Sequence, residues 1–243
     1  MENITTYPEA TIHGEIKEVF ENIFFVTGSI LMAPNLRLSR NMIIIREGES
    51  LSLISAVRLN GEGLKMLDSL GKVENIIKLG AYHLGVNNGM DDAFYINRYD
   101  AKYWAMPGVE HQKGLETPDT LLPNGSLPFA NSSLFAFETS KMPEGLILIP
   151  KEGGVLISAD SLQNWTHVDP YFSEFGGIQM QRGGFIKPAN IGPEWFRICE
   201  PQESDFNRIE ELEFQHVLPS HGVPLMNTAK SEFKSTFKTF FNK

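Results

Sequence analysis

The sequence is short of cysteine: its 243 residues include a single one, Cys199, which excludes an intrachain disulfide and a metal site built from several thiolates. Cys199 ends the apolar run Trp-Phe-Arg-Ile-Cys at residues 195–199. A thiol in such surroundings is predicted to be buried and unreactive.

Positive charge is also scarce, since 21 lysine and arginine residues face 30 aspartate and glutamate residues and the formal net charge is −9. A protein that binds a phosphate backbone needs basic patches. The regularly spaced Lys230, Lys234 and Lys238 fall on one face of a predicted helix, where we expect them to be solvated. The composition therefore predicts no nucleic-acid partner.

Long apolar runs are missing as well, because no stretch approaches the roughly 18 residues that a membrane span requires. Residues 1–5 lack the basic segment that precedes an apolar core in a signal peptide. No internal repeat or low-complexity segment is found. We expect a soluble cytoplasmic protein with no membrane partner.

The hydrophobic pattern predicts one α/β domain that spans residues 1–243. Residues 1–20 are predicted to form an extended arm or an edge strand. Segments 23–28, 41–46 and 51–57 are predicted strands of an antiparallel meander, because they are β-branched or alternate in polarity.

The remainder alternates predicted helices with predicted strands. These elements are a helix capped by Asn60 and ended by Gly71, a strand at 73–79, a short helix near 93–96 capped by Asp91 or Asp92, strands at 101–105, 134–137, 145–150 and 214–218, and helices at 204–212 and from about 228. Residues 107–133 and 166–194 are predicted to be irregular because they are rich in glycine, proline and aromatic residues.

One strand ends in a carboxylate. Gly153 and Gly154 suit a tight hairpin turn, and residues 155–158 (Val-Leu-Ile-Ser) are predicted to be a strand buried on both faces. Asp160 follows, at the carboxyl end of a buried strand, where α/β folds place their chemistry. The alternative is that Asp160 only caps the next turn or helix.

Two other predicted strands also end in ionisable residues. His83 follows the strand at 73–79 and is itself followed by Asp91 and Asp92, and His221 follows the strand at 214–218. If these strand ends converge with Asp160, the set has the composition of a Zn, Fe or Mn site. Such a site supplies a metal-bound hydroxide at neutral pH. The alternative is that the histidines bond to backbone groups and the acids cap helices or turns.

Residues 153–160, followed about 60 residues later by Val-Leu-Pro-Ser-His-Gly-Val-Pro-Leu at 217–225, resemble the C-terminal half of the metallo-β-lactamase superfamily. The resemblance implies a four-layer αβ/βα sandwich, in which two mixed β-sheets are flanked by helices. It also implies that Asp160 takes the position of a metal-bridging aspartate, that His221 takes that of the histidine of a second metal site, and that His83 stands at the first histidine.

The chain departs from that family's pattern. Its His-x-His-x-Asp-His signature is reduced here to His83, because Leu-Gly-Val-Asn-Asn follows at 84–88. The third metal-binding histidine, expected before the strand at 145–150, is absent, and Ser55 and Ala56 replace an acid at the end of an early strand. We therefore expect a divergent member of the family without the usual two-zinc centre.

Two functions remain open at this point. The first is a metal-dependent, hydrolase-like protein that binds one Zn, Fe or Mn ion at most, with ligands drawn from His83, Asp91, Asp92, Asp160 and His221. Its substrate is an unknown small molecule. The alternative is a non-catalytic protein that keeps the fold as a ligand-binding or protein-interaction module without a metal. The aromatic-rich residues near Tyr171 are either an interface of a homo-oligomer or a lid.

Overall fold

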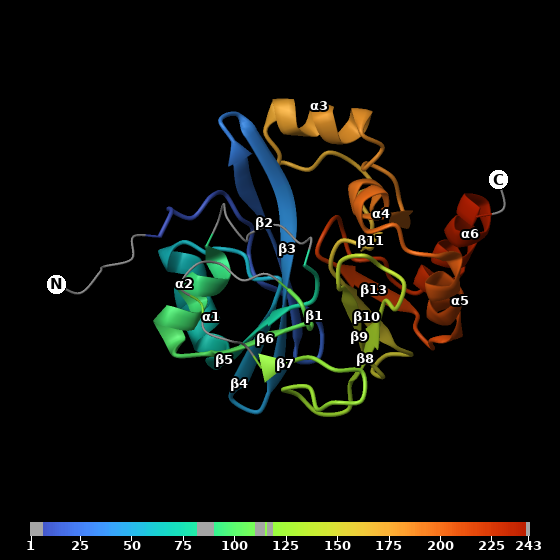
Figure 1. Cartoon of the computed structure of the whole chain (residues 1–243). Coiled ribbons are helices and arrows are strands. Elements are labelled where there is room, and N and C mark those ends of the chain that lie inside the picture. Colours follow the sequence, from blue (N-terminus) through green and yellow to red (C-terminus); the bar gives the residue numbers. More distant parts are fainter. Residues whose placement is uncertain (1–6, 82–89, 110–114, 116–118, 242–243) are drawn as a thin grey trace.

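The computed structural model describes residues 7–81, 90–109, 115 and 119–241. Two β-sheets pack face to face and helices cover their outer sides, so that the layers run helix, sheet, sheet, helix (Figure 1). The larger sheet has the strand order β1-β2-β3-β4-β5-β6-β7, and the second sheet has the order β13-β10-β9-β8. The predicted four-layer sandwich is confirmed.

The larger sheet begins as the predicted antiparallel meander. Its strands are β1 (Lys17–Phe20), β2 (Ile23–Ala33), β3 (Leu36–Glu47) and β4 (Ser50–Ile54). The strand β1 is an edge strand paired with β2, as one of the two alternatives for residues 1–20 predicted. The β2–β3 hairpin is longer than predicted, because its pairing continues from Ile23 opposite Ile45 to Ala33 opposite Leu36.

The sheet then becomes parallel and uses helical crossovers. The elements are α1 (Gly61–Leu70), β5 (Lys72–Lys78), α2 (Asp91–Tyr99), β6 (Lys102–Ala105) and β7 (Asp119–Thr120). Asn60 caps α1 as predicted, since its side chain accepts hydrogen bonds from the N–H groups of Glu62 and Gly63. The predicted capping of α2 by Asp91 or Asp92 is wrong. Met90 occupies the N-cap position without a side-chain hydrogen bond, and both aspartates lie in the first turn, where Asp91 pairs with Arg40 instead.

The second sheet contains β8 (Ser133–Ala136), β9 (Gly145–Ile149), β10 (Val155–Ser158) and β13 (His216–Pro219). The turn between β9 and β10 uses Gly153 at φ 82° and Gly154 at φ 100°, as the glycine pair predicted. A Cβ atom on Gly154 would lie 2.2 Å from the carbonyl oxygen of Glu213. All four residues of β10 are buried, which confirms the prediction of a strand covered on both faces.

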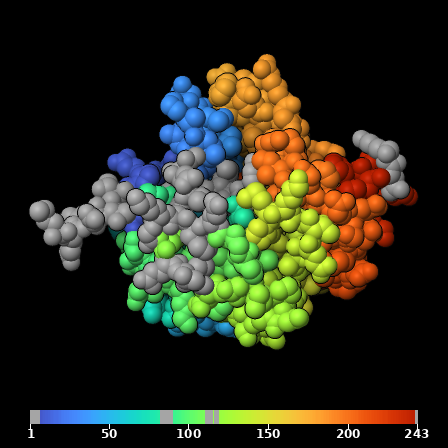
Figure 2. Space-filling view, in the orientation of Figure 1, coloured from blue at the N-terminus to red at the C-terminus, as the bar shows by residue number. Residues whose placement is uncertain are grey.

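Residues 166–194 are more regular than predicted. This part of the chain and its flanks contain β11 (Leu162–Gln163), α3 (Glu174–Arg182), β12 (Asn190–Ile191) and α4 (Pro193–Cys199). Ser173 caps α3. Gly176 lies against the backbone of Arg37 on β3 and Gly177 lies against the side chain of Val168, so these two glycines serve close packing and do not break the helix. The helix α3 stands beside the tip of the β2–β3 hairpin (Figures 1 and 2).

Two large apolar cores hold the described layers together, beside a smaller cluster around Trp165. One lies between the two sheets and also under α1 and α2, and the other lies between the second sheet and the helices α4, α5 (Glu203–Glu211) and α6 (Ala229–Phe241). Trp195, Phe206 and Phe233 are buried in this second core. In the described part of the chain no helix is long and apolar enough to cross a membrane.

Cys199 is buried in the second core, which confirms the prediction made from its apolar surroundings. Burial, and then the nearby carboxyl group of Glu144, raises the pKa of the Cys199 thiol to about 11. At pH 8 roughly one thiol in a thousand is then ionised, so we expect the native protein to be inert to Ellman's reagent. One equivalent of thiol should react in guanidinium chloride, and rapid reaction of the folded protein would contradict this placement.

Candidate metal centre

Asp160 and His221 lie at the same end of the second sheet because their strands are parallel neighbours. In the pairing of β10 with β13, Ser158 is opposite Pro219. Each candidate ligand follows its paired residue by two positions, so both side chains emerge at the carboxyl ends of adjacent strands. The expected convergence of these two strand ends is observed.

The two side chains are in direct contact. Asp160 Oδ1 and His221 Nε2 are 3.0 Å apart, and the residues are 4% and 2% exposed. Two ligand atoms that each lie about 2.0–2.2 Å from the same metal are about 3.0–3.5 Å apart in octahedral or tetrahedral coordination. The spacing therefore suits either a hydrogen bond or two neighbouring ligands of one metal.

The backbone around His221 is fixed by several polar contacts. The N–H of Asn164 donates to the His221 carbonyl at 2.9 Å, and the Asn41 amide donates to the Gly222 carbonyl at 2.6 Å. Gly222 has φ 99°, a conformation that favours glycine. The ring of Trp165 packs against the imidazole with 5.0 Å between centroids. These contacts orient the imidazole towards Asp160.

Asp91 is placed differently from Asp160. Its carboxylate forms an ion pair with the guanidinium of Arg40 on β3, and both side chains are buried. Burial lowers the pKa of Arg40 to about 10, while the negative charge of Asp92 opposes that shift. Because a buried guanidinium already neutralises Asp91, this carboxylate is a poor candidate for a metal ligand.

A second buried cation, Lys78, lies at the end of β5 and is 4% exposed. Burial lowers the pKa of Lys78, and the negative charges of Asp92 and Asp160 act in the opposite direction. The ammonium group therefore lies in the electrostatic field of two of the predicted ligands. The sequence alone did not single out this lysine.

Glu144 is a further member of the site that the sequence reasoning missed. It is fully buried immediately before β9, and its Oε1 accepts a hydrogen bond of 2.7 Å from the N–H of Ser161. Burial, and then the charge of Asp160, raises the pKa of Glu144 well above its ordinary value. Its Oε2 has no hydrogen bond within the described ranges. The signal available in the sequence was position, since Glu144 lies where the resemblance led us to expect a third histidine.

Comparison with solved structures identifies the fold. DIM-1 metallo-β-lactamase matches with a TM-score of 0.60 at 16% identity, over 97% of this chain and 100% of that one. FIM-1 from Pseudomonas aeruginosa, in its mono-zinc form, matches with a TM-score of 0.61 at 10% identity, over 96% and 98%. A metallo-β-lactamase from Hirschia baltica matches with a TM-score of 0.58 at 13% identity, over 92% and 97%. No protein-family model and no curated protein sequence matches the chain.

The chain has the metallo-β-lactamase fold. Identities of this size establish the fold alone, so activity has to be argued from the site. Ser55 follows β4 directly, and its hydroxyl accepts a hydrogen bond of 2.7 Å from the hydroxyl of Ser220. The end of the early strand therefore contributes one hydroxyl, paired with that of Ser220 after β13, where the resemblance led us to expect a carboxylate.

The residues of this metallo-β-lactamase-fold site fit a metal only in part. Asp160 and His221 supply two ligands of suitable type and spacing. Among the residues that the structure describes, no group of three or more His, Cys, Asp and Glu side chains is placed to hold a metal ion. His83 lies outside the described residues. Within the described part of the chain, Asp160 and His221 therefore form a pair that a further ligand would have to complete.

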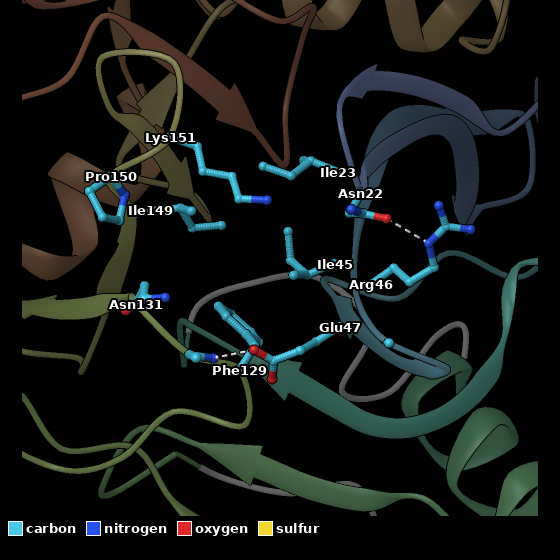
Figure 3. A pocket seen from close by; sticks show the side chains of 12 residues that line it. Asn22, Ile23, Ile45, Arg46, Glu47, Phe129, Asn131, Ile149, Pro150 and Lys151 are labelled. Carbon is cyan, nitrogen blue, oxygen red and sulfur yellow. Dashed lines mark hydrogen bonds between the residues drawn. The ribbon is translucent and has the colours of Figure 1, made fainter.

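A large hollow lies at the opposite end of the sheets. It has a volume of about 520 Å³ and lies near the turn before β10, whereas Asp160 follows that strand. Figure 3 shows Ile23, Ile45, Phe129 and Ile149 facing it, with Lys151 at its side. Of the predicted ligands that the structure describes, Asp91, Asp92, Asp160 and His221, none lines this hollow.

Proposed function

We propose that the chain is a hydrolase-like protein of the metallo-β-lactamase fold that binds a single divalent metal through Asp160 and His221. The contact of 3.0 Å between these buried side chains, at the ends of adjacent parallel strands, is the observation that carries the proposal. Mixed imidazole and carboxylate ligands suit Zn, Fe or Mn. His83 is the proposed third ligand, on sequence position alone.

The case for Asp91 and Asp92 as ligands is weaker. Asp91 is neutralised by Arg40, and Asp92 lies in the field of Lys78. Glu144 is a fully buried carboxyl group near Asp160, but within the described ranges it does not complete a group of three ligands with Asp160 and His221. We therefore place the proposed centre on the second sheet, at the ends of β10 and β13.

When bound, a metal at this position supplies a Lewis acid and lowers the pKa of a coordinated water. The chain's own residues would bind that metal and hold its ligands in position. Trp165 packs against the His221 ring, and Asn41 holds the turn that follows it. The Ser161 N–H is bonded to Glu144, which fixes the backbone next to Asp160. The substrate of the proposed activity is a small molecule whose class the described residues do not specify.

A metal-free binding protein is the second candidate, and one specific observation favours it. The buried guanidinium of Arg40 pairs with Asp91, and the charges of Asp92 and Asp160 favour the protonated form of the buried Lys78, so part of the negative charge is balanced without a metal. In that case the contact between Asp160 and His221 is a structural hydrogen bond. Metal content distinguishes the two candidates.

We expect wild-type protein, purified without chelator or nickel resin, to carry close to one equivalent of Zn, Fe or Mn by elemental analysis. Metal at a hundred times its Kd should also stabilise the folded state by about 2.7 kcal/mol, because the ligand binds that state alone. His221→Ala should abolish both effects. His167→Ala is the matched control, because His167 is exposed and contacts Thr166.

Two results would count against this proposal. Metal-free protein whose Tm ignores added metal would exclude the metal-dependent function and leave the binding module. Metal uptake that survives in His221→Ala would show that the ligands are assigned wrongly. A loss of uptake in both His221→Ala and His167→Ala would mean that the effect is not specific to the site.

A further inference from the structure

The hollow near the turn before β10 has an apolar lining drawn from both sheets. Ile23 and Ile45 come from β2 and β3 of the larger sheet, and Ile149 ends β9 of the second sheet. Phe129 adds an aromatic ring from the segment before β8. At about 520 Å³ the hollow has the size of a small-molecule site, and this lining suits a ligand with an apolar body.

A tight turn between β9 and β10 presents one cation, Lys151, at this lining. The N–H of Gly154 donates to the Lys151 carbonyl at 2.7 Å, and the two residues between them, Glu152 and Gly153, both have positive φ, as in a type I′ hairpin turn. The turn is also tied to β13, because His216 Nε2 lies 2.9 Å from the Glu152 carbonyl oxygen. Figure 3 shows the Lys151 side chain extending over the hollow. The backbone that carries this ammonium group is therefore held in place before any ligand binds.

The other charged side chains at the hollow are already engaged. The described residues that line it include two basic residues, Arg46 and Lys151, and one acidic residue, Glu47. Arg46 Nε donates to Asn22 Oδ1 at 2.8 Å, and Glu47 Oε1 accepts a hydrogen bond of 3.1 Å from the N–H of Ala130. Among the described residues, Lys151 forms neither an ion pair nor a side-chain hydrogen bond. Lys151 is therefore the cation that can receive an anionic group of a ligand.

These features together define the charge of the ligand as well as its apolar character. An ammonium group at the edge of an apolar lining favours a ligand whose carboxylate forms a charge-assisted hydrogen bond while its body is buried. A second negative charge on the same ligand would be repelled by Glu47, which lies across the hollow from Lys151 (Figure 3). The hollow therefore favours one negative charge on an apolar body.

We propose that this hollow binds an aliphatic monocarboxylate, whose carboxylate pairs with Lys151 and whose chain lies against Ile23, Ile45 and Ile149. The site is a second one, because none of the described candidate metal ligands lines the hollow. The proposal goes beyond the proposed metal-dependent function and does not rest on it, since it needs no metal.

Titration calorimetry with three eight-carbon probes tests the proposal, in the presence of chelator because a carboxylate also binds metals. Octanoate should bind wild-type protein at one molecule per chain with a Kd below about 1 mM. 1-Octanol lacks the charge and should bind at least roughly tenfold more weakly, as should suberate, which carries a second carboxylate. An absence of octanoate binding, or equal binding of octanoate and 1-octanol, would overturn the proposal.

Substitution of Lys151 separates the charge from the apolar lining. Lys151→Gln should weaken octanoate binding at least roughly tenfold and leave 1-octanol binding within about twofold of wild type, because only the ion pair is lost. Lys151→Arg keeps the charge and should bind octanoate nearly as wild type does. Lys65→Gln is the matched control, because Lys65 is exposed on α1 and does not line the hollow. Unchanged octanoate affinity in Lys151→Gln would overturn the proposal.

The apolar part of the site is tested by Ile149→Ala, which should weaken octanoate and 1-octanol alike, each at least roughly threefold, because both lose the same apolar contact. If Ile149→Ala does not fold, Phe129→Leu carries the same test. Unchanged binding of both probes to the folded variant would show that the chain does not lie in the hollow, and would overturn the proposal.

His221→Ala distinguishes this site from the candidate metal centre. We expect His221→Ala to bind octanoate as wild type does, because His221 does not line the hollow. Octanoate binding that is lost in His221→Ala and in chelator would place the carboxylate at the metal centre and overturn the proposal. Wild-type protein that takes up no metal but binds octanoate through Lys151 would exclude the proposed function alone.

Discussion

Arg40→Met should destabilise the folded state by about 3–5 kcal/mol, because the substitution leaves the buried carboxylate of Asp91 without its cation. Arg40 is 1% exposed and Asp91 is 5% exposed, so water cannot replace the lost charge without opening the first turn of α2. Urea unfolding at pH 7 measures the change.

The double variant Arg40→Met/Asp91→Asn is the matched control for that prediction. It removes both charges, and we expect it to recover most of the lost stability, since an uncharged buried pair costs less than a single buried charge. A value for Arg40→Met within about 1 kcal/mol of wild type would contradict the ion pair. Equal destabilisation in the single and double variants would attribute the loss to packing.

Gly222→Ala should destabilise the protein by about 2–5 kcal/mol and abolish metal uptake. A Cβ atom at this position would lie 2.1 Å from the carbonyl carbon of Asn164, and φ is 99°. The backbone must therefore move, and His221 is the adjacent residue. Thermal unfolding and elemental analysis measure the two effects.

Gly48→Ala is the control that introduces backbone strain without the steric clash expected at Gly222. Gly48 also has positive φ, at 61°, but nothing lies within 4 Å of an added Cβ atom. We expect Gly48→Ala to cost about 1–2 kcal/mol and to leave metal uptake unchanged. Similar results for Gly222→Ala and Gly48→Ala would show that the turn after His221 is more tolerant than the structure indicates.

The parts of the fold that local sequence determines could be predicted. Gly153 and Gly154 require a conformation that favours glycine, and the apolar residues after them can form only a buried strand, so Asp160 was placed correctly at its end. His221 was placed by the same reasoning at the end of β13. Their convergence followed from the resemblance, and the parallel pairing of β10 with β13 confirms it.

Features that depend on distant partners could not be predicted. Asp91 looks like a helix cap in the sequence, and only the fold brings Arg40 from β3 to its carboxylate. Lys78 ends an apolar segment where a solvated lysine is common, and its burial arises because the chain then crosses to the second sheet. The placement of Glu144 depends on the same crossing, because Gly80 forms a β-bridge with it. The helix α3 was missed because its glycines serve close packing, Gly176 against β3 and Gly177 against Val168.

The measurement that tests the account most directly is an anomalous difference map at the zinc absorption edge, from crystals grown with zinc. The account predicts one peak within about 2.0–2.2 Å of both Asp160 Oδ1 and His221 Nε2. A map without a peak at this position, in which the two side chains still contact each other directly, would contradict the proposed metal centre.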